Sequence, residues 1–232
     1  MIEFANLTKS YPGRLPVLDQ VKMKIDPGSF FFLSGVSGAG KTTVFKLLLL
    51  LELPNKGRIH FDGADILQYS PSQRARHRRR IGTVFQEQDN RLLANETIEE
   101  NVALPLRIAG LSGKDMRRRI QLLLEQVGLA ERRKELVSGL SSGEKQLVSI
   151  ARALVFSPQV FFADEPTGNL DQSVAFMVME LLREIHRSGC TVIVATHDLN
   201  LIRSFRSRTL LIKDRKIHEV RLVSPPAAAA ML

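Results

Sequence analysis

The chain has 232 residues, 44% of them hydrophobic, and its 33 Lys and Arg residues against 24 Asp and Glu residues give a net charge of +9. A chain of this length buries about 70% of its unfolded surface, enough for one α/β core with a modest appendage. The charge favours an anionic partner: a nucleic acid, an acidic protein surface or a phospholipid membrane. The single cysteine, Cys190, excludes an intrachain disulfide. Because it lies beside an apolar run, we expect a buried thiol in a reducing compartment.

The first 34 residues alternate between apolar and polar side chains, which predicts antiparallel strands. Residues 1–6 contain neither a basic nor a long apolar segment, so we expect no signal peptide. The apolar run 30–33 leads into a glycine-rich loop, and a leucine-rich stretch follows over residues 44–53. This stretch contains two charged residues and is too short to span a bilayer, so it predicts a buried helix behind the loop.

The loop fits the phosphate-binding pattern G-x-x-x-x-G-K-S/T in the strand–loop–helix context that the motif requires. Its glycines let successive backbone N–H groups point at phosphate oxygens. Lys41 is placed to reach the β- and γ-phosphates, and the Thr42 hydroxyl to bind Mg²⁺. The sequence therefore predicts a nucleoside triphosphate site formed by Gly35, Val36, Ser37, Gly38, Ala39, Gly40, Lys41, Thr42 and Thr43.

Beyond the loop, the pattern predicts alternating strands and helices, and hence a largely parallel sheet. Ser70-Pro71-Ser72 lies in a segment that we interpret as rich in turns. Helical periodicity runs from Thr97 to about Gln126, and Gly110 and Gly113 divide it into two pieces. The other expected elements are strands at 59–61 and 81–85, a helix from 139 to about 156, a strand at 160–163, a helix after 171, and strands at 191–196, 209–213 and 216–220.

The strand at 160–163 ends in two adjacent carboxylates, Asp164 and Glu165. A phosphate loop needs one carboxylate for Mg²⁺ and one for the attacking water. Asp164 would hold the metal through its waters. Glu165 would orient and polarise the nucleophilic water, a role worth about 10²–10⁴-fold in rate.

Further stretches occur in the order of a known family's motifs. Leu140-Ser141-Ser142-Gly143-Glu144 lies where that family carries LSGGQ, Gln86 fits the Q-loop glutamine, Asn169-Leu170-Asp171 the D-loop, His197 the switch histidine, and Tyr11 the aromatic residue that stacks on adenine. The chain thus resembles the ATP-binding subunits of ABC transporters over nearly its full length. The resemblance implies ATP and Mg²⁺ as cofactors, with Gln86 contacting the metal and His197 the γ-phosphate.

The resemblance also implies the P-loop NTPase fold of ABC ATPases. This fold has a mixed central sheet, N-terminal antiparallel strands and a helical subdomain, here inserted at about residues 90–156 of a single domain over residues 1–224. Residues 225–232, two prolines followed mainly by alanines, predict a flexible tail.

The predicted helix start near Ser141 offers free N–H groups and a positive dipole end to an anion. By resemblance, Ser141, Ser142, Gly143 and Glu144 close over ATP held by a second protomer, with Asp171 nearby, in a head-to-tail homodimer. Two positions depart from the family pattern: Ser142 replaces a glycine, and Leu147 stands where relatives often carry arginine. A Cβ at position 142 would crowd the γ-phosphate, so we expect a competent but slower ATPase.

Within the superfamily, the chain is most similar to the FtsE family of bacterial cell-division ATPases. The resemblance lies in residues 101–110, 163–171 and 195–202. It implies an FtsX-type integral membrane partner, control of septal cell-wall hydrolysis, and a place on the cytoplasmic face of the inner membrane. The run over residues 164–171 is shared with lipoprotein-release and macrolide-efflux ATPases, which are the alternative. The expected docking surface lies between Gln86 and the inserted helices and includes Leu92, Leu93 and Asn101.

Other classes stay open. A soluble ABC protein acting on nucleic acid would suit the charge, but the chain has no tryptophan and no basic motif with interleaved aromatics, so we expect no nucleic acid partner. A scaffold that binds ATP without hydrolysing it is opposed by intact Lys41, Asp164, Glu165 and His197. Two arginine clusters either face anionic lipid or are solvated faces balanced by acids. They are Arg74, Arg76, Arg78, Arg79 and Arg80, and Arg117, Arg118 and Arg119 with Arg132, Arg133 and Lys134.

Overall fold

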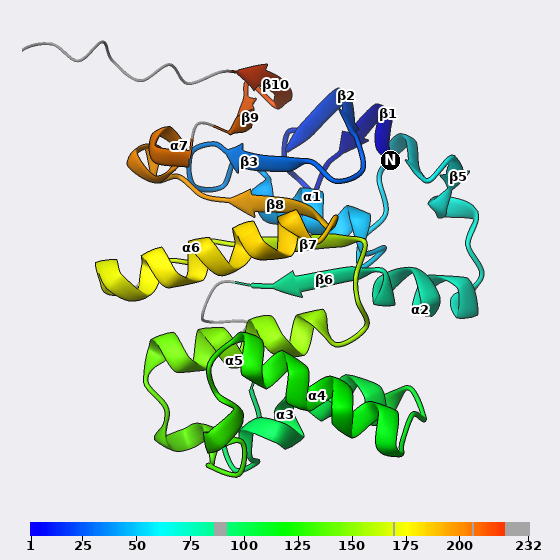
Figure 1. Ribbon diagram of the computed structural model, residues 1–232. Coiled ribbons are helices and arrows are strands. Elements are labelled where there is room, and N and C mark those ends of the chain that lie inside the picture. Colours follow the sequence, from blue (N-terminus) through cyan, green and yellow to red (C-terminus); the bar gives the residue numbers. More distant parts are fainter. Residues whose placement is uncertain (86–91, 169, 206, 221–232) are drawn as a thin grey trace, which may run out of the picture. The chain divides into compact units, whose positions relative to one another are not determined.

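The computed structural model describes residues 1–85, 92–168, 170–205 and 207–220 (Figure 1). Gln86, Asn169 and the predicted tail at 225–232 lie outside these residues. The chain forms two compact units. The first contains residues 1–25, 30–67 and those from 194 onward, and the second contains residues 26–29 and 68–193.

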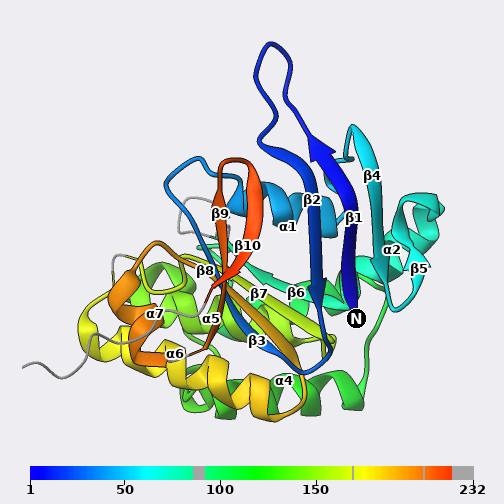
Figure 2. The same cartoon turned by 90° about the horizontal axis from the view of Figure 1, so that it is seen from above.

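An antiparallel sheet opens the first unit, as the alternating sequence predicts. Strand β1 (Ile2–Lys9) pairs with β2 (Leu18–Ile25) on one side and with β4 (Lys56–Phe61) on the other (Figure 2). The short strand β5 (Ala64–Asp65) completes the order β2-β1-β4-β5, and the 3-10 turn η1 (Ile66–Gln68) follows it. In β2 the apolar side chains are buried and the lysines between them are exposed, which fixes the face that packs on the core.

The phosphate loop follows a strand that belongs to a second, mixed sheet. Strand β3 (Phe30–Ser34) runs parallel to β9 (Arg208–Lys213), and β9 pairs antiparallel with β10 (Lys216–Val220). Helix α1 (Lys41–Leu48) begins directly after the loop. Phe31, Phe32 and Phe45 are each at most 1% exposed, so the loop is anchored at both ends in the core.

Helix α1 ends at Leu48, earlier than the predicted end at Leu53, so that prediction is wrong. Leu50 has a φ of 54°, and the N–H groups of Leu51 and Glu52 both donate to Lys46 O, at 2.9 and 3.2 Å. Leu51 and Leu53 are 57% and 49% exposed. A run of leucines indicates apolar character but not which residues face the core, because exposed leucines are common.

The second unit carries β6 (Ile81–Val84), β7 (Val160–Asp164) and the first three residues of β8 (Thr191–Ala195), and Val194 and Ala195 at the end of β8 belong to the first unit. Strand β6 runs parallel to β7, and β8 lies on the other side of β7. Helix α6 (Gln172–Arg187) joins β7 to β8. The thiol of Cys190, just before β8, is 8% exposed, as expected, and burial raises its pKa to about 12.

Three helices of the second unit pack against one another: α3 (Ile98–Ile108), α4 (Lys114–Gln126) and α5 (Ser142–Leu154) (Figure 1). The break between α3 and α4 falls at Gly110 and Gly113, as predicted. The 3-10 turns η3 (Ala130–Arg132) and η4 (Val137–Gly139) connect α4 to α5. Among the described residues, no helix is both long and apolar enough to cross a bilayer.

Two helices were not predicted. Helix α2 (Pro71–Arg79) starts at Ser70, which forms a capping box with Gln73, so the Ser-Pro-Ser segment begins a helix instead of a turn. Only His77 of α2 is buried, so the helix has no apolar periodicity to reveal it. Helix α7 (Leu199–Phe205) follows Asp198, whose Oδ1 accepts from the N–H groups of Asn200 and Leu201 at 2.8 and 3.1 Å.

Candidate nucleotide-binding and hydrolysis site

The phosphate loop is built for an anion. Lys41 begins α1, and its Nζ donates to Gly35 O at 2.9 Å, so the side chain folds back over the loop. A Cβ on Gly40, whose φ is 109°, would lie 2.6 Å from Val17 Cγ1, so this position needs glycine. No side chain among the described residues caps the start of α1. Its first N–H groups and positive dipole end are therefore suited to bind a phosphate.

Tyr11 lies against the start of α1, within the same unit. Its hydroxyl lies 3.3 Å from Thr43 Oγ1 and donates to Glu52 Oε1 at 3.1 Å. The Nζ of Lys9 lies 5.1 Å from the centroid of the Tyr11 ring. Tyr11 and Thr43 were both predicted to bind nucleotide, and the structure brings them together. Glu52 was missed, although an acid within a leucine run is a signal, because acids are rarely buried unless paired.

His197 follows β8, the strand beside β3. The N–H of Thr196 donates to Leu33 O at 3.1 Å, which aligns the end of β8 with the end of β3. The phosphate loop and His197 therefore follow the carboxyl ends of two neighbouring strands. This is the edge of an open α/β sheet where ligands bind. The His197 side chain is exposed, as a residue that reaches a ligand must be.

The two carboxylates of the second unit differ sharply in environment. Asp164 ends β7 and is 5% exposed, whereas Glu165 is half-buried. Glu165 has a φ of 47°, and its carbonyl accepts from Gly168 N at 3.1 Å in the turn that follows. Non-glycine residues rarely adopt this backbone conformation, and such residues cluster at functional sites.

The signature segment starts α5. Ser141 is the N-cap: its Oγ accepts from Glu144 N at 3.3 Å, and its N–H donates to Glu144 Oε2 at 2.8 Å. Ser142 is exposed at the first helical position. Arg132 forms an ion pair with Glu144 and a second one with Glu135 at 2.8 Å. The hydrogen bond from the Ser141 N–H and the Arg132 guanidinium together lower the pKa of Glu144.

The signature helix contacts the segments that carry Glu165 and Asp171, all within the second unit. Gln146 Nε2 donates to Pro166 O at 3.0 Å. A Cβ on Gly143 would lie 2.5 Å from Cγ1 of Val174, in the first turn of α6. Asp171 is the N-cap of α6: its Oδ1 accepts from Ser173 Oγ at 2.6 Å and from Val174 N at 3.0 Å. No sequence signal singles out Gln146, because glutamine is seldom buried and its partner, the Pro166 carbonyl, lies 20 residues away along the chain.

The side chains predicted to hold Mg²⁺ are oxygen ligands, the type that this ion prefers. Gln86, predicted as a ligand, lies outside the described residues. Thr42, in the first unit, offers a hydroxyl oxygen, and Asp164, in the second unit, offers a carboxylate. Mg²⁺ is usually held by one or two carboxylates with substrate phosphates and waters. No cluster of three or more His, Cys, Asp or Glu residues suited to a metal occurs in the described part of the chain.

The predicted docking surface needs one correction, at Asn101. This residue is 0% exposed, and its side chain bonds the backbone of the segment before α3: its Oδ1 accepts from Leu93 N at 2.7 Å, and its Nδ2 donates to Leu93 O at 3.0 Å. Asn101 therefore holds that segment in place and cannot contact a partner. Leu93 itself is 43% exposed.

Both arginine clusters contain side chains with structural partners. Arg80 donates to Gln159 Oε1 from Nε at 2.9 Å and from Nη2 at 2.6 Å. Arg119 donates to Leu154 O at 3.1 Å, beside its contact with Val155 O, at the carboxyl end of α5. The ion pairs of Arg132 with Glu135 and Glu144 favour the interpretation of the second cluster as a face balanced by acids. The hydrogen-bond partners of Arg80 and Arg119 named above are neutral.

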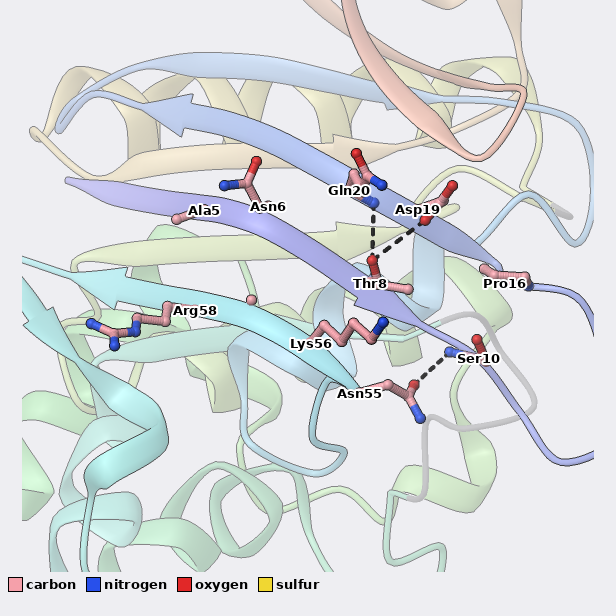
Figure 3. Close-up of a pocket in the computed structure, with 11 residues that line it drawn as sticks. Ala5, Asn6, Thr8, Ser10, Pro16, Asp19, Gln20, Asn55, Lys56 and Arg58 are labelled. Carbon is pink, nitrogen blue, oxygen red and sulfur yellow. Dashed lines mark hydrogen bonds between the residues drawn. The ribbon is translucent and has the colours of Figure 1, made fainter.

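A hollow of about 730 Å³ lies over β1, β2 and β4 of the first unit (Figure 3). Asn55 bridges its floor, where Asn55 Oδ1 accepts from Ser10 N at 2.7 Å. The residues predicted to bind nucleotide are not among those that line it. We therefore treat this hollow as separate from the candidate site.

The loop before α1, the Asp-Glu pair after β7 and the signature at the start of α5 define an ATP-binding P-loop nucleoside triphosphatase with an inserted signature helix. The family model described as "ABC transporter" matches residues 18–168. The chain belongs to the ABC transporter family, and it is the ATP-binding and ATP-hydrolysing subunit of an ABC complex. The fold predicted from the sequence is thereby confirmed.

Relatives and solved structures match this chain over nearly its whole length. The cell division ATP-binding protein FtsE of Escherichia coli strain K12 is 44% identical over 94% of this chain and 97% of its own length. The FtsE of Bacillus subtilis is 38% identical over 92% and 93%. The dimeric ATP-binding cassette MJ0796, in a post-hydrolysis state with ADP and Pi, is 32% identical over 97% of this chain and 100% of its own, with a TM-score of 0.84.

Proposed function

We propose that this chain is the ATPase of a cell-division complex, acting with an FtsX-type integral membrane protein to control septal cell-wall hydrolysis. The observation that carries the proposal is the match to relatives named as cell division ATP-binding proteins over almost their entire length. The chain would then work at the cytoplasmic face of the inner membrane, where its partner holds it.

The roles of the site residues are part of the proposal. Lys41 and the N–H groups of the loop bind the phosphates of ATP, and Tyr11 stacks on adenine. Thr42, Asp164 and Gln86 hold Mg²⁺, which neutralises phosphate charge. Glu165 polarises the attacking water, and His197 contacts the γ-phosphate. These roles belong to one ATPase domain over residues 1–224, with the helical subdomain at about 90–156 inserted in it.

ATP binding would also join two copies of the chain head to tail. The start of α5 offers the N–H groups of Ser142 and Gly143 to an anion. In this arrangement Ser141 to Glu144 of one copy cover the ATP held by the phosphate loop of the other, and Asp171 lies at the dimer contact. A single copy would hydrolyse ATP slowly, because it holds half of each site.

A groove of about 460 Å³ in the second unit is the proposed docking site for the membrane partner. Its apolar wall includes Phe85 and Ile108, and Ile108 is 78% exposed. Arg78, Arg79 and Arg152 also line it, and the Arg79 guanidinium lies 5.4 Å from the Phe156 ring centroid. An apolar groove lined by arginines suits an amphipathic helix that carries a carboxylate, such as a cytoplasmic helix of the partner.

Affinity capture from native membranes tests the proposal. Glu165→Gln removes the group that polarises water, so with ATP and Mg²⁺ it should hold the closed dimer on its partner. Mass spectrometry should then find an FtsX-like protein together with division or cell-wall components. A lipoprotein-release or macrolide-efflux permease instead would support the alternative, and nucleic acid without a membrane protein would contradict both.

The groove is tested by a matched pair of substitutions in the Glu165→Gln background. Ile108→Glu should reduce partner recovery at least tenfold, because it places a charge in the apolar wall. Leu122→Glu, at a 55% exposed leucine on α4, should leave recovery unchanged. Equal recovery from both variants would remove the groove from the proposal but leave the ATPase assignment intact.

A further inference from the structure

Residues Glu52 to Asn55, in the segment after α1, form a clamp on the end of β1, just before Tyr11. Asn55 N donates to Thr8 O at 2.8 Å, and Ser10 N donates to Asn55 Oδ1 at 2.7 Å (Figure 3). A side chain of β1 also contacts this segment: Lys9 Nζ donates to Leu53 O at 2.9 Å. The backbone that leads from β1 to Tyr11 is thus held by residues that are distant in sequence.

Glu52 is the centre of this clamp. Its Oε1 accepts from the Tyr11 hydroxyl at 3.1 Å and lies 3.6 Å from Lys46 Nζ, and its Oε2 lies 3.0 Å from Lys9 Nζ. The side chain is 21% exposed. Burial alone would raise the pKa of Glu52, but the hydrogen bonds from Lys9 and Tyr11 and the charge of Lys46 lower it overall. The carboxylate is therefore ionised at neutral pH.

This charge fixes the direction of the hydrogen bonds around Tyr11. An ionised carboxylate only accepts, so the single hydroxyl hydrogen of Tyr11 points to Glu52. Thr43 must then be the donor in its 3.3 Å contact with the Tyr11 oxygen. Lys9 covers one face of the ring, with Nζ 5.1 Å from the centroid. The ring is held at its hydroxyl end, and a base has to stack on the face opposite Lys9.

We propose that Glu52 is a positioning residue for nucleotide binding: it holds the Tyr11 ring in the orientation that receives adenine. The inference rests on the proposed role of Tyr11 as the stacking residue. The early end of α1 is consistent with this role. The left-handed Leu50 and the bonds from Leu51 and Glu52 back to Lys46 O reverse the chain, and this reversal aims Glu52 at Tyr11.

The expected effect is a selective loss of affinity for the base. Immobilising a mobile side chain upon binding costs about 0.5–1.5 kcal/mol, which corresponds to roughly 2- to 12-fold in affinity. Glu52→Gln in the full chain should therefore bind ATP about 3- to 10-fold more weakly. Inorganic tripolyphosphate, which has no base, should compete as well against the variant as against the wild type. A general weakening of the phosphate loop would reduce both affinities.

A double-mutant cycle separates this inference from the proposed function. If Tyr11→Ala weakens ATP binding and Glu52→Gln adds nothing in that background, Glu52 acts through Tyr11. If Tyr11→Ala leaves ATP affinity unchanged, the stacking role of Tyr11 is wrong. If Tyr11→Ala weakens binding but Glu52→Gln alone does not, the positioning inference is wrong. Glu3→Gln removes a carboxylate from β1, the strand that precedes Tyr11, and is the matched control.

A spectroscopic signature gives a second readout. The chain has no tryptophan and two tyrosines, so in a Tyr69→Phe background the fluorescence comes from Tyr11. Hydrogen bonding to a carboxylate quenches tyrosine emission, so Glu52→Gln should brighten the nucleotide-free protein while its far-UV circular dichroism stays unchanged. An unchanged emission would overturn the proposed hold on the Tyr11 hydroxyl.

Discussion

At the scale of single residues, the start of α5 combines a serine on the surface with a glycine in close contact. Ser142 is exposed, and the N-cap is already provided by Ser141. Ser142 therefore adds little to the helix cap, and the main effect of its side chain would fall on whatever approaches the helix start. Gly143 is buried, and Val174 leaves no room for a side chain at this position.

We predict that Ser142→Gly raises ATP turnover. Removing the side chain relieves crowding of the γ-phosphate, and an effect of ~0.7 kcal/mol on the barrier would correspond to about threefold in rate. Steady-state phosphate release at saturating ATP measures it. Unchanged turnover and ATP affinity would mean that the serine does not crowd the nucleotide.

Gly143→Ala should destabilise the chain by about 1–3 kcal/mol, because a Cβ 2.5 Å from Val174 Cγ1 forces α5 and α6 apart. Urea unfolding measures this loss. Gly139→Ala is the control, since a Cβ at Gly139 would meet no atom within 4 Å. Equal stability of the two variants would show that α5 and α6 accommodate the added Cβ without loss of free energy of unfolding.

At the scale of elements, the apolar periodicity predicted the strands and the inserted helices well. Gly110 and Gly113 divide α3 from α4 as expected, β7 ends at Asp164, and β8 ends two residues before His197. The errors have physical causes. Helix α2 packs almost no side chain, so a capping box and a proline begin it without a periodic signal. Leu51 and Leu53 continue the apolar run that Leu49 and Leu50 bury, but their own side chains face solvent.

In the candidate site, the sequence predicted the residues of local motifs but not those that act on distant segments. Motif residues such as Lys41, Glu165 and Ser141 are recognised by sequence spacing, because their neighbours along the chain create the geometry. Glu52 and Gln146 act across the fold, on Tyr11 and on the Pro166 carbonyl. A contact between segments distant in sequence leaves no local pattern, so only the structure reveals it.

The start of α5 should be sensitive to acid. The pKa of Glu144 is lowered in the folded chain, so its ionised form stabilises the fold above the unfolded pKa of about 4.3. This contribution is lost as the pH falls through the lowered value. Glu144→Gln keeps an acceptor for Ser141 but loses the charge. We expect the wild type to lose about 0.5 kcal/mol more than this variant between pH 7 and pH 3.5, measured by urea unfolding. Equal losses would contradict this role.

At the scale of the whole molecule, dimer formation should depend on ATP and on an intact site. Glu165→Gln with ATP and Mg²⁺ should double the mass measured by light scattering from the 26.0 kDa of one chain. Lys41→Ala should stay at the mass of one chain, because it loses phosphate contacts. A Glu165→Gln protein that stays monomeric at saturating ATP would show that the chain alone is not enough to close the site.

The bond from Gln146 to Pro166 has a consequence for such a dimer. It joins the helix that would cover the partner copy's ATP to the segment that follows Glu165, the residue that we propose to act on the chain's own ATP. Each copy would therefore carry a direct mechanical link between both reaction centres. Filling one centre should bias the geometry of the other, and ATP consumption should rise with substrate concentration more steeply than a hyperbola, with a Hill coefficient above one.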